Sequence, residues 1–195
     1  MRNIAIMASG SGTNAENIIK YFSNKKRAKI SLVLSNRHEA LVLKRAEALN
    51  VETCFFEYND FYSSGRVLDK LLESKIDLIV LAGFLWLVPE NILTAFKKRI
   101  INIHPALLPR YGGKGMYGER VHKAVIASGD RESGITVHYV NKNYDEGDII
   151  FQARCRIAPS DTPESLASKI HLLEYEHYPE VIEKLLREQA AQTKK

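Results

Sequence analysis

Two polar side chains stand at the end of an apolar segment, Ile100–His104, that is followed directly by a proline. Asn102 and His104 are two residues apart, so on an extended strand they share one face. An amide can hold a carbonyl oxygen, and an imidazole can move a proton or stabilise a developing oxyanion. The alternative is an asparagine bonded to a loop backbone and a histidine satisfied in the core. The spacing alone leaves both interpretations open.

A polar turn further along the chain supplies carboxylates. The segment "NYDEGD" contains Asp145, Glu146 and Asp148. Acids in a turn are usually solvated turn residues. One of them could instead reach an imidazole and raise its basicity. Residue types alone do not say which acid that would be.

A glycine-rich loop lies within Ala8–Ile18, after the first apolar run. Gly10, Gly12 and Ala15 match a variant of the dinucleotide fingerprint, in which the backbone approaches a ligand and helix-start amides favour a phosphate. A bare structural turn is the alternative. Arg37 could accept a 2′-phosphate at the end of the second strand, where no acid stands. The loop could therefore belong to an NADP-dependent reductase or a nucleotide-binding module, or it could bind a single monophosphate group.

The elements that must position these residues alternate between short apolar runs and helical patterns. The patterns predict strands over 3–7, 30–35, 52–56, 77–84 and 100–104, with helices over 14–22, 40–49, 67–75 and 89–96. This order predicts an α/β fold with an open, doubly wound, mostly parallel sheet, whose ligands bind beyond the carboxyl ends of the strands. We expect a loop over 111–118, a helix over 119–128, an antiparallel hairpin of 134–140 and 149–157, and a long final helix over 163–186.

The composition is that of a soluble globular protein. Of the 195 residues, 45% are hydrophobic and 26% are charged, and the net charge is +5. The basic runs are short and lack interleaved aromatic residues, so solvated faces are favoured over a nucleic-acid partner. The longest apolar run, 78–88, is well below the roughly 18 residues that indicate a membrane span. We expect one domain over 1–195 with a frayed tail at 187–195.

The cysteines and histidines give no sign of a metal site. The two cysteines, Cys54 and Cys155, form no CxxC motif or disulfide framework, which favours a reducing cytoplasm. No HExxH or other ligand spacing is present, so we expect no metal. The sequence does not indicate an oligomeric state.

Several motifs, taken in order, resemble those of glycinamide ribonucleotide transformylase, the folate-dependent formyltransferase family of purine synthesis. They are "SGSGTN", "LAGF", "NIHPALLP", "GITVHYV", "DEGDIIFQ" and the final-helix pattern with Glu174 and "YP". The resemblance covers roughly residues 3–186 and implies a Rossmann-like formyltransferase fold. It also implies transfer of the formyl group of 10-formyltetrahydrofolate to the amino group of glycinamide ribonucleotide, with these two small molecules as substrates and no metal.

The resemblance further implies roles for named residues. Asn102 would bind the formyl oxygen, His104 would stabilise the tetrahedral oxyanion and assist proton transfer, and Asp145 would orient His104 or raise its pKa. The ribonucleotide would be bound by Gly12, Thr13, Asn14, Ala15, Glu16 and Glu174. The folate would be bound by Leu85, Trp86, Leu87, Val88 and Asn102. Many relatives carry an arginine at the position of Trp86, for which core packing is the alternative role.

Two other formyl-folate enzymes share parts of this pattern. A formyl-folate hydrolase would use water in place of the amine, and methionyl-tRNA formyltransferase shares the strand-end motif around Asn102 and His104. Relatives of both kinds carry a further domain, for which 195 residues leave no room. We therefore expect the ribonucleotide-dependent transferase.

Overall fold

The computed structural model describes residues 1–192, of which 190–192 are described only as helical backbone. In chain order the strands are β1 (Arg2–Met7), β2 (Ala28–Ser35), β3 (Glu52–Phe55), β4 (Leu78–Leu81), β5 (Ile100–His104), β6 (Glu132–Tyr139) and β7 (Ile149–Arg156). The helices are α1 (Thr13–Phe22), α2 (Leu41–Ala48), α3 (Tyr58–Tyr62), α4 (Arg66–Glu73), α5 (Glu90–Ala95), α6 (Glu119–Ala127) and α7 (Pro163–Gln192).

All seven strands form one sheet in the order β3-β2-β1-β4-β5-β6-β7. The strands from β3 to β5 pair in parallel, whereas β6 pairs antiparallel with both β5 and β7. This arrangement confirms the predicted α/β sheet and its C-terminal antiparallel hairpin. The fold class follows from the alternation of strand and helix, because parallel neighbours need a crossover helix between them.

The central strands are buried on both faces, which explains their continuous apolar runs. In β1, Ile4 and Ile6 point into one core cluster, whereas Ala5 and Met7 point into the other. Successive side chains of a strand face opposite sides, so a strand covered on both sides needs apolar residues at every position. The whole of β4 is buried in the same way.

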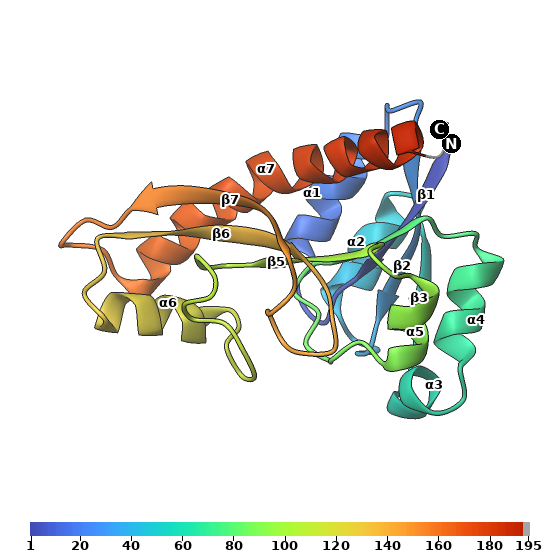
Figure 1. Cartoon of the computed structure of the whole chain (residues 1–195), viewed down its shortest axis with the longest axis horizontal. Helices are drawn as coiled ribbons and strands as arrows, with labels where there is room; N and C mark the ends of the chain where they lie inside the picture. Colours follow the sequence, from blue (N-terminus) through green and yellow to red (C-terminus); the bar gives the residue numbers. More distant parts are fainter. Residues whose placement is uncertain (193–195) are drawn as a thin grey trace.

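Each face of the sheet has its own helical layer (Figure 1). The first core cluster packs under α1, α2, α6 and α7, and Figure 1 shows α7 running along α1. The second cluster packs under α3, α4 and α5 and includes Phe61, Leu71 and Ile92. In α4 the hydrophobic residues Val67 and Leu71 are four apart, so they lie on one side of the helix and are buried together.

The strand order reverses between β1 and β4. The chain winds from β1 through β2 to β3 in one direction, then returns to add β4 and β5 on the other side of β1. The loops that leave the ends of β1 and β4 therefore diverge to opposite faces and open a crevice, the usual ligand site of such sheets. The glycine-rich loop and the segment after "LAGF" both lie at this point.

Two elements differ from the sequence expectation. The short helix α3 was not predicted, because five residues carry too little periodicity to be recognised. The last helix continues to Gln192 instead of ending at Leu186 as predicted, and 193–195, which belong to the expected frayed tail, lie outside the described residues. Within the described part of the chain, no helix is both long enough and apolar enough to cross a membrane.

Candidate active site

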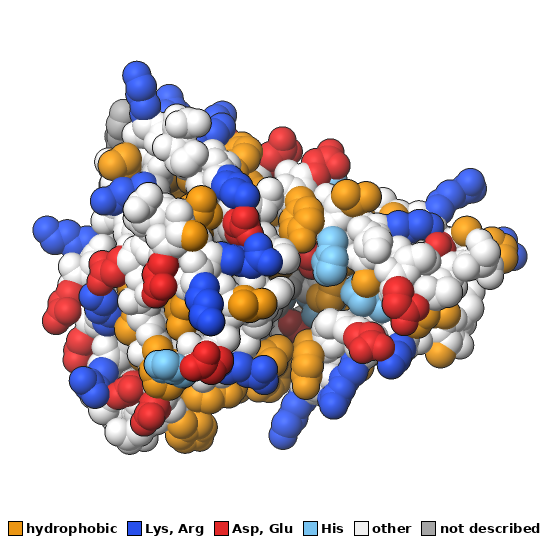
Figure 2. Space-filling model, turned by 180° about the vertical axis from the view of Figure 1, so that it is seen from behind, with side chains coloured by type: hydrophobic (Ala, Val, Ile, Leu, Met, Phe, Trp, Pro, Cys, Tyr) orange, Lys and Arg blue, Asp and Glu red, His pale blue; other side chains and the backbone are white. Residues whose placement is uncertain are grey.

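A cavity of about 420 Å³ opens at the carboxyl ends of β1, β4 and β5. The glycine-rich loop and the segment 85–88 line one part of it, and the loop before α6, the turn between β6 and β7, and α7 line the rest. Figure 2 shows a hollow near the middle of one face of the molecule with histidine side chains gathered beside it. The predicted residues Asn102, His104 and Asp145 all line this cavity.

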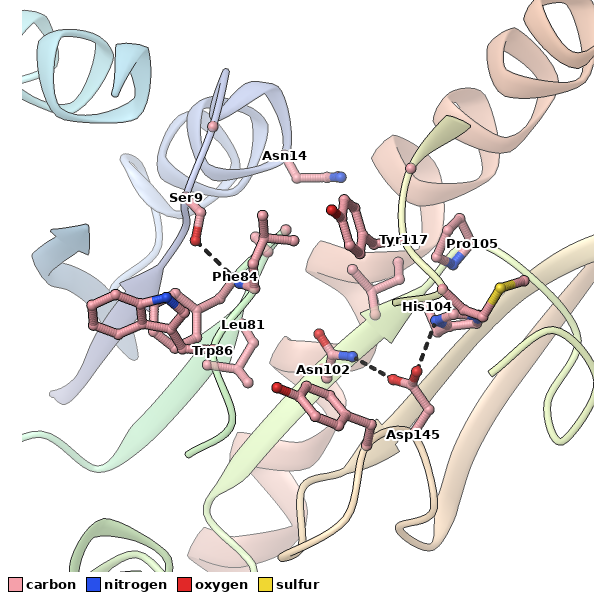
Figure 3. A pocket seen from close by; sticks show the side chains of 18 of the residues that line it. Ser9, Asn14, Leu81, Phe84, Trp86, Asn102, His104, Pro105, Tyr117 and Asp145 are labelled. Carbon is pink, nitrogen blue, oxygen red and sulfur yellow. Dashed lines mark hydrogen bonds and ion pairs between the residues drawn. The ribbon is translucent and has the colours of Figure 1, made fainter. Parts of the chain in front are cut away.

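Asn102, His104 and Asp145 form one connected cluster (Figure 3). His104 Nδ1 lies 3.4 Å from Asp145 Oδ2, and Asn102 Nδ2 lies 3.4 Å from Asp145 Oδ1. His104 is 3% exposed, so the cluster is largely shielded from bulk water. The turn carrying Asp145 thus folds back over β5, and the structure selects this acid among the three in the turn. Glu146 instead bonds Asn143 within the turn.

The loop after β5 holds both partners of this pair. His104 Nε2 lies 2.8 Å from the carbonyl oxygen of Tyr111, and the Gly113 amide donates to Asp145 Oδ2 at 3.0 Å. A carbonyl oxygen can only accept, so Nε2 carries the proton. In neutral His104 the free lone pair is therefore on Nδ1, beside Asp145. The sequence could not predict that Tyr111 and Gly113 contact His104 and Asp145, because both act through backbone atoms, which every residue type has.

Burial and charge oppose each other at His104. Burial lowers the pKa of His104 below its ordinary value, although the Asp145 carboxylate and the Tyr111 carbonyl act to raise it. The sequence expectation is that Asp145 orients His104 or raises its pKa; the carboxylate acts in that direction, but the net shift of the His104 pKa is downward. For Asp145, burial acts to raise the pKa, but the net shift is downward, and the amide of Gly113, which donates to Oδ2, is one of the groups that stabilise the carboxylate. At neutral pH the pair is an uncharged imidazole beside a carboxylate.

His138 is a member of the cluster that sequence reasoning missed. Its Nδ1 lies 2.8 Å from the carbonyl oxygen of Tyr139, so Nδ1 carries the proton and Nε2 is an acceptor. Asn102 Nδ2 donates to this Nε2 at 3.2 Å, which fixes which end of the Asn102 amide is nitrogen. A signal was present, because His138 alternates with apolar residues in "ITVHYV" and pairs directly with Asn102 across β5 and β6.

The start of α1 forms another wall of the cavity. Gly12 adopts a φ of 75°, and a Cβ there would lie 2.5 Å from Val42 Cβ, so the turn and the close approach of α2 both require glycine. Gly12, Thr13 and Asn14 line the cavity as expected. Asn14 Nδ2 donates to Glu174 Oε2 at 2.8 Å, and burial raises the pKa of Glu174. The structure thereby joins two predicted ribonucleotide-binding residues that are far apart in the chain.

Two other predicted ribonucleotide-binding residues do not line the cavity. The Ala15 side chain is buried in the core on the sheet side of α1. Glu16 forms ion pairs with Lys20 and Arg45, which lower its pKa and direct it away from the cavity. On a helix, residues two apart point in different directions, so Asn14 and Glu16 do not share a face. Neither side chain therefore faces the cavity, and any contact of Ala15 or Glu16 with the ribonucleotide would have to be made through the backbone.

The segment after β4 supplies the four predicted folate-binding residues, Leu85, Trp86, Leu87 and Val88, and all of them line the cavity. The rest of the protein holds this segment at both ends. Ser9 Oγ accepts the Leu85 amide at 3.1 Å, and Tyr62 Oη donates to the Leu87 carbonyl at 2.7 Å. Ser9 and Tyr62 were not predicted, because each acts on backbone across distant parts of the chain.

Trp86 packs among aromatic rings and also lines the cavity. Its ring contacts four other aromatic rings, with centroid separations of 5.6 Å to Tyr58, 5.9 Å to Tyr62, 6.0 Å to Phe61 and 6.1 Å to Phe56. It is nevertheless only partly buried and belongs to the cavity wall. Trp86 therefore packs the segment 85–88 against α3, and this packing fixes the wall from behind.

The arrangement provides an acceptor for a proton, an acid to stabilise the resulting cation, and amide groups within one shielded cavity. Among the described residues, no group of three or more histidine, cysteine or carboxylate side chains is placed to hold a metal ion. Such a site suits attack of one bound molecule on a carbonyl group of another, with a proton passing through His104.

Comparison with known proteins gives a consistent result. The family described as formyl transferase matches residues 2–182. A protein of Bacillus subtilis named phosphoribosylglycinamide formyltransferase is 35% identical over 191 residues, covering 95% of this chain and 95% of the relative. A chloroplastic protein of Arabidopsis thaliana with that name is 38% identical over 187 residues, and the match covers 93% of this chain but only 64% of that relative.

A solved structure supports the same assignment. The crystal structure of phosphoribosylglycinamide formyltransferase from Bacillus halodurans superposes with a TM-score of 0.85 at 35% identity, covering 95% of both chains. The resemblance found in the motifs is therefore confirmed over nearly the whole chain, and the Asn102–His104–Asp145 cavity lies inside the matched region. On this evidence the chain belongs to the formyl transferase family.

Proposed function

We propose that this protein transfers the formyl group of 10-formyltetrahydrofolate to the amino group of glycinamide ribonucleotide, which gives formylglycinamide ribonucleotide and tetrahydrofolate. The observation that carries the proposal is the cluster of Asn102, His104 and Asp145 between two differently built walls of one cavity. One wall is apolar and aromatic, as a pterin ring system requires. The other has helix-start amides and polar side chains, as a ribose phosphate requires.

The phosphate would lie at the start of α1, where the first amides of the helix have no partner within the helix. Glu174 would accept hydrogen bonds from the ribose hydroxyls, and Asn14 holds Glu174 in place at 2.8 Å. The pterin would lie against Leu85, Leu87 and Val88, where backbone groups can bond its ring nitrogens. These positions bring the amine and the formyl group together beside Asn102 and His104.

The transfer needs one bond to form and one to break. The amine nitrogen of the ribonucleotide attacks the formyl carbon, and the carbonyl oxygen becomes an oxyanion. His104 Nδ1 carries the free lone pair and accepts the proton that the amine loses. The Asp145 carboxylate, 3.4 Å away, stabilises the imidazolium that results. When the bond from the formyl carbon to N10 of the folate breaks, the imidazolium returns this proton to N10.

Asn102 would bind the formyl oxygen. Of the two hydrogens on Nδ2, one donates to His138 at 3.2 Å, and the other makes the long 3.4 Å contact with Asp145. That second hydrogen is the one a formyl oxygen can take over, because its present contact is weak. His138 keeps the amide from turning its oxygen toward the oxyanion. We further propose that the catalytic unit is a single domain acting on small molecules in the cytoplasm, where the free Cys54 and Cys155 would stay reduced.

The direct test is the formation of tetrahydrofolate from 10-formyltetrahydrofolate with and without glycinamide ribonucleotide. We expect turnover only when the ribonucleotide is present, together with formylated ribonucleotide in equal amount. Equal turnover without the ribonucleotide would identify a formyl-folate hydrolase instead. A parallel titration with NADP should give no binding. Tight binding of NADP would instead support the cofactor-dependent alternative.

A further inference from the structure

A third buried histidine, besides His104 and His138, lines the cavity and has no assigned role. His122 lies in α6 on the same buried side as Val121 and Val125, and it is 3% exposed. An apolar residue would satisfy that position without the cost of burying a polar ring. His122 nevertheless reaches the cavity wall.

The ring of His122 lacks hydrogen-bond partners. Its Nδ1 is buried without a partner among the described residues, and no hydrogen bond is made by Nε2 in that part of the chain. Nε2 does not share the full burial of Nδ1, so it is the nitrogen that remains accessible at the cavity wall. Polar atoms inside proteins almost always have a partner, and neither ring nitrogen of His122 has one among the described residues, so the accessible Nε2 is free to bind a ligand in the cavity.

The unpartnered Nδ1 indicates the tautomer. Burial lowers the pKa of His122, and the neighbouring His171 and His104 lower it further, against a small opposing effect of Glu119. The ring is therefore neutral and carries one proton. A buried N–H without a partner is rarer than a buried acceptor without one. Nδ1 is accordingly the bare nitrogen, and Nε2–H is a donor facing the cavity.

The position of His122 identifies the part of the substrate that it meets. His122 lines the same cavity as His104, His171 and Glu174. It is close enough to His104 and His171 for their charges to act on it, and His171 in turn acts on Glu174, so His122 lies near both the formyl-transfer cluster and the proposed ribose site. In a ribonucleotide that spans these two points, the intervening group is the glycinamide arm. The acceptor in that arm is its amide carbonyl oxygen.

We propose that His122 Nε2–H donates a hydrogen bond to the carbonyl oxygen of the glycinamide arm and so positions the amine for attack. The proposal rests on the proposed function and adds a specificity residue for the ribonucleotide. A neutral donor suits an uncharged carbonyl, whereas the phosphate is matched by the amides at the start of α1. Loss of His122 should therefore weaken only ligands that carry the arm.

The test is calorimetric binding of two ligands, glycinamide ribonucleotide and ribose 5-phosphate, which lacks the arm. We expect His122→Leu to bind the ribonucleotide about tenfold more weakly, the effect of one lost hydrogen bond to a partly desolvated carbonyl. Binding of ribose 5-phosphate should not change. His122→Gln places an amide N–H near the position of Nε2 and should restore most of the affinity. His177→Leu, outside the cavity wall, is the matched control and should bind both ligands normally.

Equal loss for both ligands, or loss for neither, would overturn the proposal. If the unchanged protein fails to bind the ribonucleotide, the proposed function itself fails, and this outcome is separate from any effect of the variants. A second measurement uses only the unchanged protein and so does not depend on the folding of a variant. The ¹⁵N resonance of His122 Nε2 should shift with the ribonucleotide and stay in place with ribose 5-phosphate. A shift with both, or with neither, would contradict the assignment.

Discussion

The polar groups at the two ends of the cavity are satisfied in different ways. Around β5, His104, Asn102 and Asp145 bond one another, His138 and the loop backbone. Toward α1 and α6, Asn14 Oδ1 and His122 Nδ1 are buried without partners among the described residues. The first end is complete before any substrate binds, as electrostatic stabilisation of a transition state requires. At the second end the network is incomplete, and the accessible Nε2 of His122 can bond a substrate.

This difference predicts that substitutions at the first end affect turnover and those at the second end affect binding. The largest effect should come from His104→Ala. We expect kcat to fall by about 10³-fold, because general acid–base catalysis contributes roughly 10²–10⁴-fold. Ribonucleotide binding, measured by calorimetry, should stay within about twofold of the unchanged protein, because the phosphate and the ribose are bound at the other end of the cavity. Equal losses of kcat and binding would remove the distinction between the two ends.

Asp145→Asn should reduce kcat by about 10²-fold, since the imidazolium loses its carboxylate partner. The pH dependence gives a sharper result. Asp145 raises the pKa of His104 against burial, so its removal lets that pKa fall further. Neutral His104 is the proton acceptor, and it would then persist to lower pH. The acid limb of the kcat profile should therefore move to lower pH, and a move to higher pH would contradict the assigned interaction.

Glu174→Gln probes the second end. The amide can still accept from Asn14 with its oxygen but places a donor where the other carboxylate oxygen stood. We expect ribonucleotide affinity to fall by about tenfold, with kcat at saturating ribonucleotide little changed. Initial rates at varied ribonucleotide concentration separate these quantities. A fall in kcat without a change in KM would place Glu174 in the catalytic step.

The smallest effect should come from Tyr62→Phe, which removes the hydrogen bond from Tyr62 Oη to the Leu87 carbonyl. One such bond is worth about 0.5–1.5 kcal/mol, so KM for 10-formyltetrahydrofolate should rise a few-fold while KM for the ribonucleotide stays constant. Tyr58→Phe is the control, because the Tyr58 ring also contacts Trp86 but, among the described residues, its hydroxyl makes no hydrogen bond to segment 85–88. An equal effect in both variants would attribute the change to ring packing around Trp86.

Much of the fold could be predicted from local pattern. The alternation of apolar runs and helical segments indicated the parallel sheet, because each run is long enough for one strand and too short for a buried helix. Helix ends were less accurate. The helix α7 continues past Leu186 through a charged stretch, where i,i+4 pairs such as Glu183 with Arg187 support the helix without an apolar face.

The site was predictable where side-chain type and spacing carried the signal. Asn102 and His104 share a face of β5 and end at the crevice, as their two-residue spacing required. Glu16 was assigned with its neighbours because resemblance follows positions along the chain, whereas the turn of α1 directs Glu16 to Arg45. His122 and His138 were left out because a single histidine in an apolar segment is usually part of the core.

The sequence by itself therefore determined the order of the elements, the buried strands and the pair at the end of β5, because these depend on periods of two or 3.6 residues along the chain. Only the tertiary structure decided which acid meets His104, which nitrogen of His104 is free, and which polar atoms lack partners. Those features join residues such as Asn14 and Glu174, which are 160 positions apart. Local pattern carries no information about such contacts, since they exist only once the sheet has brought the loops together.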